Sequence, residues 1–74
     1  MNDLLGFYLK ELREKQGLSL KEAAENIGSL SFEVIARWER GEVVPPLGLA
    51  AQIAATYGVS EDEVKEILLD AGDS

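Results

Sequence analysis

The chain has 74 residues, contains neither cysteine nor histidine, and carries a net charge of −7. A chain of this length forms one small domain, and the missing residue types exclude disulfides, thiolate metal sites and the commonest general base. No apolar run approaches the ~20 residues that cross a bilayer, and no signal peptide is visible, so we expect no membrane contact and a cytoplasmic location.

The first segment has leucines at helical spacing, at Leu5, Leu9 and Leu12. Asn2 or Asp3 can cap the start of a helix there. Gly17 suits the left-handed backbone conformation that ends many helices. We therefore predict a helix over residues 3–16.

A second, shorter helix follows. Ser19 and Glu22 have the spacing of a capping box, in which each side chain accepts a hydrogen bond from the other residue's backbone N–H. Gly28 ends the helix after about two turns. Its apolar positions are Leu20, Ala23, Ala24 and Ile27.

The third helix begins at a cap that is either Ser29 or Ser31, and it ends at Gly41. Its apolar positions are Phe32, Ile35, Ala36 and Trp38. Trp38 is expected in the core, whereas core packing and partner contact are both open for Phe32. Residues 42–46 then form a connector, since paired prolines cannot continue a helix.

Two more helices complete the chain. Pro46 suits the first position of the fourth helix, Gly48 within it should cost roughly 1 kcal/mol relative to alanine, and Gly58 ends it. Ser60 and Glu63 form a second capping box at the start of the fifth helix. The expected buried positions are Leu49, Ala50, Ile53, Ala54, Tyr57, Val64, Ile67, Leu68 and Ala71.

These patterns predict an all-α protein of five helices in a single domain over residues 3–71, with frayed ends at 1–2 and 72–74. The second and third helices are short and are joined by a turn, which is the helix-turn-helix arrangement. In that arrangement the outward face of the third helix can enter a DNA major groove about 12 Å wide.

The chain resembles the lambda-repressor-like, Xre-type regulators. The resemblance rests on the order and spacing of several stretches between Leu5 and Leu68. These are Leu5-Gly6, LREKQGLS at 12–19, Glu22-Ala23-Ala24, Trp38-Glu39-Arg40-Gly41, Pro45 and AATYGVS at 54–60. The resemblance implies the same five-helix fold and a structural ion pair between Arg13 and Glu39.

The resemblance also implies which residues would touch DNA. Base contacts would come from the start of the third helix, at Ser31, Phe32, Glu33, Ala36 and Arg37. Arg37 could bind guanine through two hydrogen bonds, or be an ordinary solvated charge. Phosphate contacts would come from Lys21, Arg40 and the amino-terminal ends of the second and third helices.

The distribution of charge and the types of polar side chain indicate whether the protein could be an enzyme. Acidic and basic residues balance over residues 10–41, and most of the excess negative charge lies in residues 61–73. Carboxylates occur without histidine, a metal-binding loop pattern or a phosphate-binding glycine loop. We therefore predict no catalytic site, no metal and no cofactor, so the protein is not expected to be an enzyme.

Two functions remain. The first is a sequence-specific transcriptional regulator that binds double-stranded DNA, as a homodimer through the fifth helix and the end of the fourth. Leu69 with Val43 and Val44 could form an exposed apolar patch suited to association. The alternative, favoured by the net charge, Phe32 and Glu33, is a protein-interaction module on the same fold that has lost DNA binding.

Overall fold

The computed structural model describes residues 3–73, with the backbone alone for residue 73. Its elements are α1 (Asp3–Lys15), α2 (Leu20–Gly28), α3 (Phe32–Glu39), the 3-10 turn η1 (Leu47–Leu49), α4 (Ala50–Tyr57) and α5 (Glu61–Asp73). The predicted all-α fold with five helices is confirmed, and residues 3–73 contain no strand. The predicted frayed residues 1–2 and 74 lie outside the described residues, and α5 continues two residues beyond the predicted domain end.

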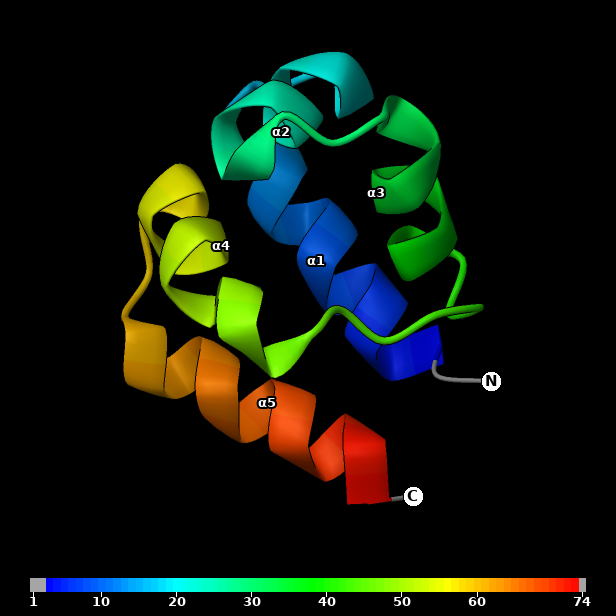
Figure 1. The fold of residues 1–74 in the computed structure, drawn as a ribbon, viewed down its shortest axis with the longest axis vertical. Helices are drawn as coiled ribbons and strands as arrows, with labels where there is room; N and C mark the ends of the chain where they lie inside the picture. The colour runs from blue at the N-terminus through cyan, green and yellow to red at the C-terminus, as the bar shows by residue number, and fades with distance from the viewer. Residues whose placement is uncertain (1–2, 74) are drawn as a thin grey trace.

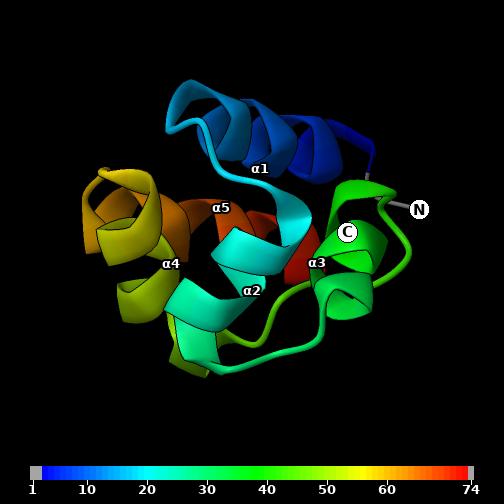
Figure 2. The ribbon, with the colours of Figure 1, turned by 90° about the horizontal axis from the view of Figure 1, so that it is seen from above.

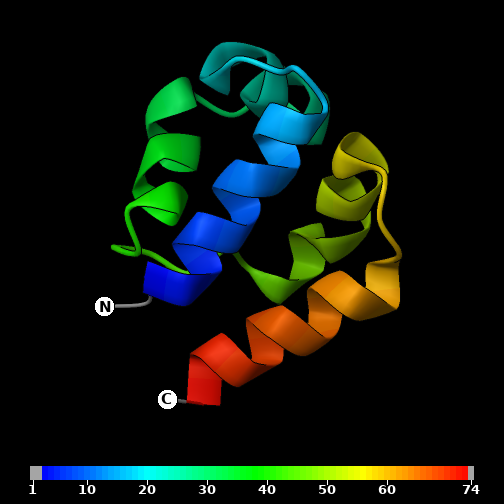
Figure 3. The ribbon, with the colours of Figure 1, turned by 180° about the vertical axis from the view of Figure 1, so that it is seen from behind.

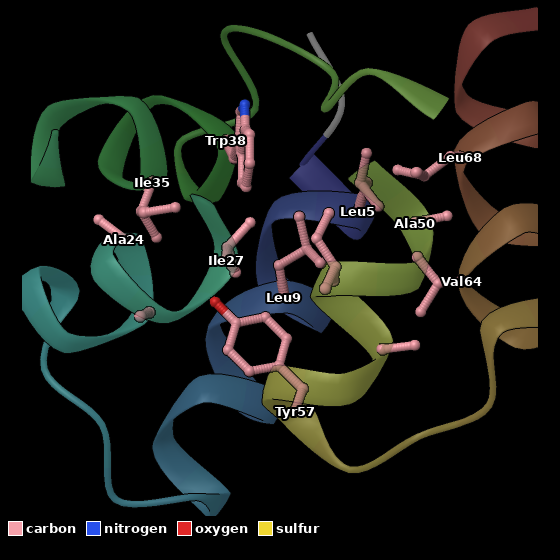
Figure 4. Packing of buried hydrophobic residues seen from close by; sticks show 13 residues of the cluster. Leu5, Leu9, Ala24, Ile27, Ile35, Trp38, Ala50, Tyr57, Val64 and Leu68 are labelled. Atoms are coloured by element: carbon pink, nitrogen blue, oxygen red, sulfur yellow. The ribbon is translucent and has the colours of Figure 1, made fainter. Parts of the chain in front are cut away.

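The helices surround one core (Figure 1). α1 lies on one side of α2, α3 and α4 (Figure 2), and α5 crosses one end of the molecule (Figures 1 and 3). Seen from above, α2 lies between α3 and α4 (Figure 2). Each helix contributes apolar side chains to the buried cluster (Figure 4). Its members are Leu5, Leu9, Ala23, Ala24, Ile27, Ile35, Trp38, Ala50, Ile53, Ala54, Tyr57, Val64 and Leu68.

The buried residues therefore follow the helical periodicity of the sequence. Half-buried side chains at the edge of the core include Leu20, Leu49, Ile67 and Ala71, which were predicted as apolar positions. Phe32 is the exception in the predicted apolar set, because 53% of its surface is exposed. Packing this apolar surface is what stabilises helices that are too short to persist alone.

The start of α2 agrees with the prediction. The Glu22 amide donates to the Ser19 hydroxyl at 3.0 Å, and the Ser19 amide donates to the Glu22 carboxylate at 2.9 Å. At the start of α5, the Glu63 amide donates to the Ser60 hydroxyl at 3.1 Å. The Glu63 carboxylate also accepts a hydrogen bond from the Tyr8 hydroxyl, which ties the start of α5 to α1.

α2 ends at Gly28, as predicted. The next residue, Ser29, adopts the left-handed conformation with φ of 56°. That conformation lets the Leu30 amide donate to the Ala24 carbonyl at 3.1 Å, a bond that closes the helix end. The start of α4 differs from the prediction, because Pro46 precedes a 3-10 turn and Gly48 therefore lies outside α4. The predicted loss of stability from a glycine within that helix does not apply.

Within residues 3–73, every helix is too short or too polar to cross a membrane. The same part of the chain has no group of acidic side chains placed to hold a metal ion.

Candidate nucleic-acid interface

α3 is attached to the fold by one face only. Ile35 and Trp38 point into the core and are 1% and 3% exposed. They lie near Ile27 of α2 and Leu9 of α1, which hold this face of α3 against the other helices (Figure 4). The opposite face of α3 therefore remains on the surface.

The sequence-predicted base-contacting residues lie on or beside that exposed face. Ser31, Phe32, Glu33 and Arg37 are exposed, whereas Ala36 is half-buried. Ser31 is the N-cap of α3, so of the two candidate caps it is the one used, although its side chain makes no capping hydrogen bond. The structure thus gathers these five residues along one helix and its preceding residue.

The predicted phosphate-contacting residues are also exposed. Lys21 lies in the first turn of α2, and Arg40 follows the last residue of α3. Arg40 is not free, because its Nε lies 2.6 Å from a carboxylate oxygen of Glu42. Arg37 has a carboxylate neighbour too, with Nη2 at 4.0 Å from an oxygen of Glu33.

These four charges affect one another. The hydrogen bond from Arg40 lowers the pKa of Glu42, and the positive charge of Arg37 lowers it further. The hydrogen bond to Glu42 raises the pKa of Arg40, and the charge of Glu33 adds to that effect. We call Glu33, Arg37, Arg40 and Glu42 the arginine–glutamate cluster. Sequence reasoning missed Glu42, because residues two apart do not face each other on a helix.

The end of α3 is fixed to α1 by an ion pair. Arg13 donates to both carboxylate oxygens of Glu39, with Nε at 2.7 Å and Nη2 at 3.0 Å, and its Nη1 donates to the Leu18 carbonyl at 2.9 Å. The Arg13 and Glu39 side chains are only 12% and 8% exposed. The hydrogen bond to Glu39 raises the pKa of Arg13.

Close backbone packing reinforces the same junction. Gly6 of α1 faces the Glu39 carbonyl, and a Cβ at Gly6 would lie 2.3 Å from that oxygen. Only a residue without a side chain allows this approach. The carboxyl-terminal end of α3 is thus set by contacts to α1, and this sets the direction of the exposed face.

Comparison with known proteins identifies the arrangement. A helix-turn-helix family model matches residues 9–64, which include all of α2, the turn and α3. The chain belongs to the helix-turn-helix family. No solved structure gives a significant match to it.

Two curated relatives of this helix-turn-helix protein are named as regulators. An HTH-type transcriptional regulatory protein of Pyrobaculum aerophilum is 37% identical over 65 residues, which cover 88% of this chain and 25% of the relative. The HTH-type transcriptional regulator DdrOP3 of Deinococcus deserti is 34% identical over 58 residues, which cover 78% of this chain and 44% of the relative. The chain therefore spans less than half the length of either relative.

Proposed function

We propose that this helix-turn-helix protein regulates transcription by binding double-stranded DNA, with the exposed face of α3 in the major groove. The observation that carries the proposal is the placement of Phe32, Glu33 and Arg37 outward from a helix whose other face is buried. The family match and the names of the two relatives support it. Binding at a promoter would act by occluding or recruiting the transcription machinery.

Each exposed side chain has a chemical partner in the groove. The Arg37 guanidinium matches the two acceptors of guanine, the Phe32 ring can contact a thymine methyl, and the Glu33 carboxylate can accept from a cytosine amine. Ser31 and Ala36 would line the same contact. Lys21 and Arg40 would bind phosphates and so set position rather than sequence preference.

The test is fluorescence anisotropy with labelled duplexes, both of mixed sequence and from upstream regions, over a series of salt concentrations. Phosphate contacts predict binding that weakens steeply as salt rises. Arg37→Ala should reduce sequence preference by roughly 1–3 kcal/mol and leave the melting temperature nearly unchanged. Lys10→Ala on α1 is the matched control, because it removes an exposed positive charge outside the proposed DNA interface and outside α5.

A protein-interaction module on the same fold is the second candidate. Phe32 is 53% exposed on the α3 face, and both nearby arginines have carboxylate neighbours in a chain of net charge −7. An exposed aromatic residue in acidic surroundings suits a protein surface as well as DNA. Absence of binding to either duplex at every salt concentration would favour this candidate.

We further propose that the protein is a homodimer through α5 and the end of α4. Leu69 on α5 is 53% exposed although it is apolar, and Val43 is 47% exposed. Val44, which was grouped with them, is half-buried. A two-fold dimer would place two copies of α3 about 34 Å apart, on successive major-groove turns.

A further inference from the structure

In the free protein, one arginine of the arginine–glutamate cluster is already paired with a carboxylate. Arg40, the proposed phosphate-contacting residue at the end of α3, already donates to a carboxylate at 2.6 Å. A carboxylate and a phosphate offer the guanidinium the same kind of charged acceptor. DNA phosphate and Glu42 therefore compete for one guanidinium group.

The backbone holds Glu42 where it can compete. Gly41 has φ of +76°, its amide donates to the Trp38 carbonyl at 3.1 Å, and the Glu42 amide donates to the Arg37 carbonyl at 3.1 Å. These two bonds form a Schellman turn, which fixes the residue that follows the glycine beside the last turn of the helix. The Glu42 carboxylate thus reaches Arg40 from a backbone position that the helix end determines.

Glu33 is a weaker competitor for an arginine side chain than Glu42. Its carboxylate lies 4.0 Å from Arg37, beyond hydrogen-bond distance, and it stands among the proposed base-contacting residues. Glu42 lies outside that set and makes a direct hydrogen bond. Removing its charge changes the competition at Arg40 while leaving the proposed base contacts in place.

We propose that Glu42 occupies Arg40 in the free protein and so limits affinity for DNA phosphates irrespective of sequence. This inference rests on the proposed function. To bind a phosphate, Arg40 must leave Glu42, and the released carboxylate then faces the negative backbone. Sequence-independent binding is weakened by this exchange, and a site must supply base contacts to offset it.

The experiment is a double-mutant cycle on the full chain, using Glu42→Gln, Arg40→Ala and the double variant. Anisotropy against a labelled mixed-sequence duplex is measured over a salt series. Exposed ion pairs are weak, so Glu42→Gln should raise affinity by about 1.4- to fivefold. It should also steepen the dependence of affinity on salt, since Arg40 is then free to replace a counterion.

The Arg40→Ala background separates competition from general repulsion. If Glu42 acts through Arg40, Glu42→Gln gives little gain once the guanidinium is absent. Glu11→Gln is the matched control, because it removes an exposed carboxylate from α1, outside the cluster and outside the proposed dimer interface. Thermal unfolding of each variant checks that the fold is unchanged.

The outcomes separate this inference from the proposed function. A gain in affinity that is confined to chains that retain Arg40, and is larger than that of Glu11→Gln, supports the role of Glu42. DNA binding with equal gains in both backgrounds, or with no gain, overturns that role and leaves the DNA-binding proposal standing. Absence of binding by every variant overturns both.

Discussion

The Arg13–Glu39 ion pair provides a quantitative test of how α3 is fixed. Arg13 makes three hydrogen bonds, two to Glu39 and one to the Leu18 carbonyl. Replacing Arg13 by methionine removes all three and leaves the Glu39 carboxylate, at 8% exposure, without its partner. Stranding one member of a buried pair costs roughly 3–5 kcal/mol, because the remaining charge keeps its desolvation penalty.

We expect Arg13→Met to lower the free energy of unfolding by about 3 kcal/mol, the lower end of that range, since the pair keeps slight solvent contact. At roughly 0.05–0.15 kcal/mol per residue, the whole chain has only about 4–11 kcal/mol of stability. The melting temperature should fall by about 10–25 °C, taking ~4–8 °C for each kcal/mol in a domain of this size. Urea denaturation and thermal unfolding followed by circular dichroism measure both quantities.

The double variant Arg13→Met with Glu39→Met decides whether the mechanism is right. Replacing both partners by apolar residues leaves no stranded charge, so the double variant should recover at least half of the single-variant loss. Losses that simply add would refute the reasoning. Lys65→Met is the control: Lys65 pairs with Glu61 at 2.9 Å, and the two side chains are 46% and 47% exposed. Loss of this exposed pair should change the free energy of unfolding much less than Arg13→Met.

Other predictions test the junction, the helix cap and the dimer. Gly6→Ala should lower the free energy of unfolding by about 3 kcal/mol, the upper end for overpacking, because the new Cβ would meet a backbone oxygen. Gly48→Ala has no atom within 4 Å of the new Cβ and should be nearly neutral. Urea denaturation measures both. Hydrogen bonds from Ser19 lower the pKa of Glu22 below its ordinary 4.5, so ionised Glu22 stabilises the fold above that pH and less as pH falls through the folded-state pKa. Glu22→Gln should therefore reduce stability at neutral pH and approach the wild type in acid, as measured by unfolding across pH. Leu69→Glu should give a monomer in light scattering if α5 forms the proposed dimer, and an unchanged mass would count against that interface.

The helices could be predicted because two independent signals agree in this chain. Apolar residues recur at helical spacing, and caps such as Ser19 mark where each run starts. The left-handed residue after α2 could not be predicted, because Gly28 is the better candidate by residue type. The structure uses Ser29 instead, since this register lets the Leu30 amide close the helix end while Leu30 packs against the core.

The start of α4 illustrates a second limit. Pro46 fits the first position of an α-helix, but the Leu49 amide donates to the Pro46 carbonyl at 3.0 Å, an i to i+3 bond that begins with a 3-10 turn. Proline restricts its own φ and lacks an N–H, and both helix types accept it at this place. Residue type alone does not distinguish them.

The exposed face of α3 could be predicted from periodicity, and its electrostatics could not. Once Ile35 and Trp38 are buried, helical geometry puts Glu33 and Arg37 outward. Phe32 lies three residues before Ile35, so periodicity places it beside the buried face, and only the structure shows that it is exposed. The contact between Arg40 and Glu42 depends instead on the turn at Gly41, which brings together residues that a continuing helix would separate. From the sequence alone, Arg40 would be taken as an unpaired positive charge, although its guanidinium is bound to Glu42.

The two ends of α3 consequently have different roles. At its carboxyl-terminal end, Glu39 is fixed by Arg13 and by close contact with Gly6, so substitutions there change the stability of the whole fold. At its amino-terminal end, Ser31 makes no side-chain cap and Phe32 contributes little to the core, so substitutions there cost little stability. The surface that would distinguish one DNA site from another is thus the part of α3 whose sequence can change without loss of the fold.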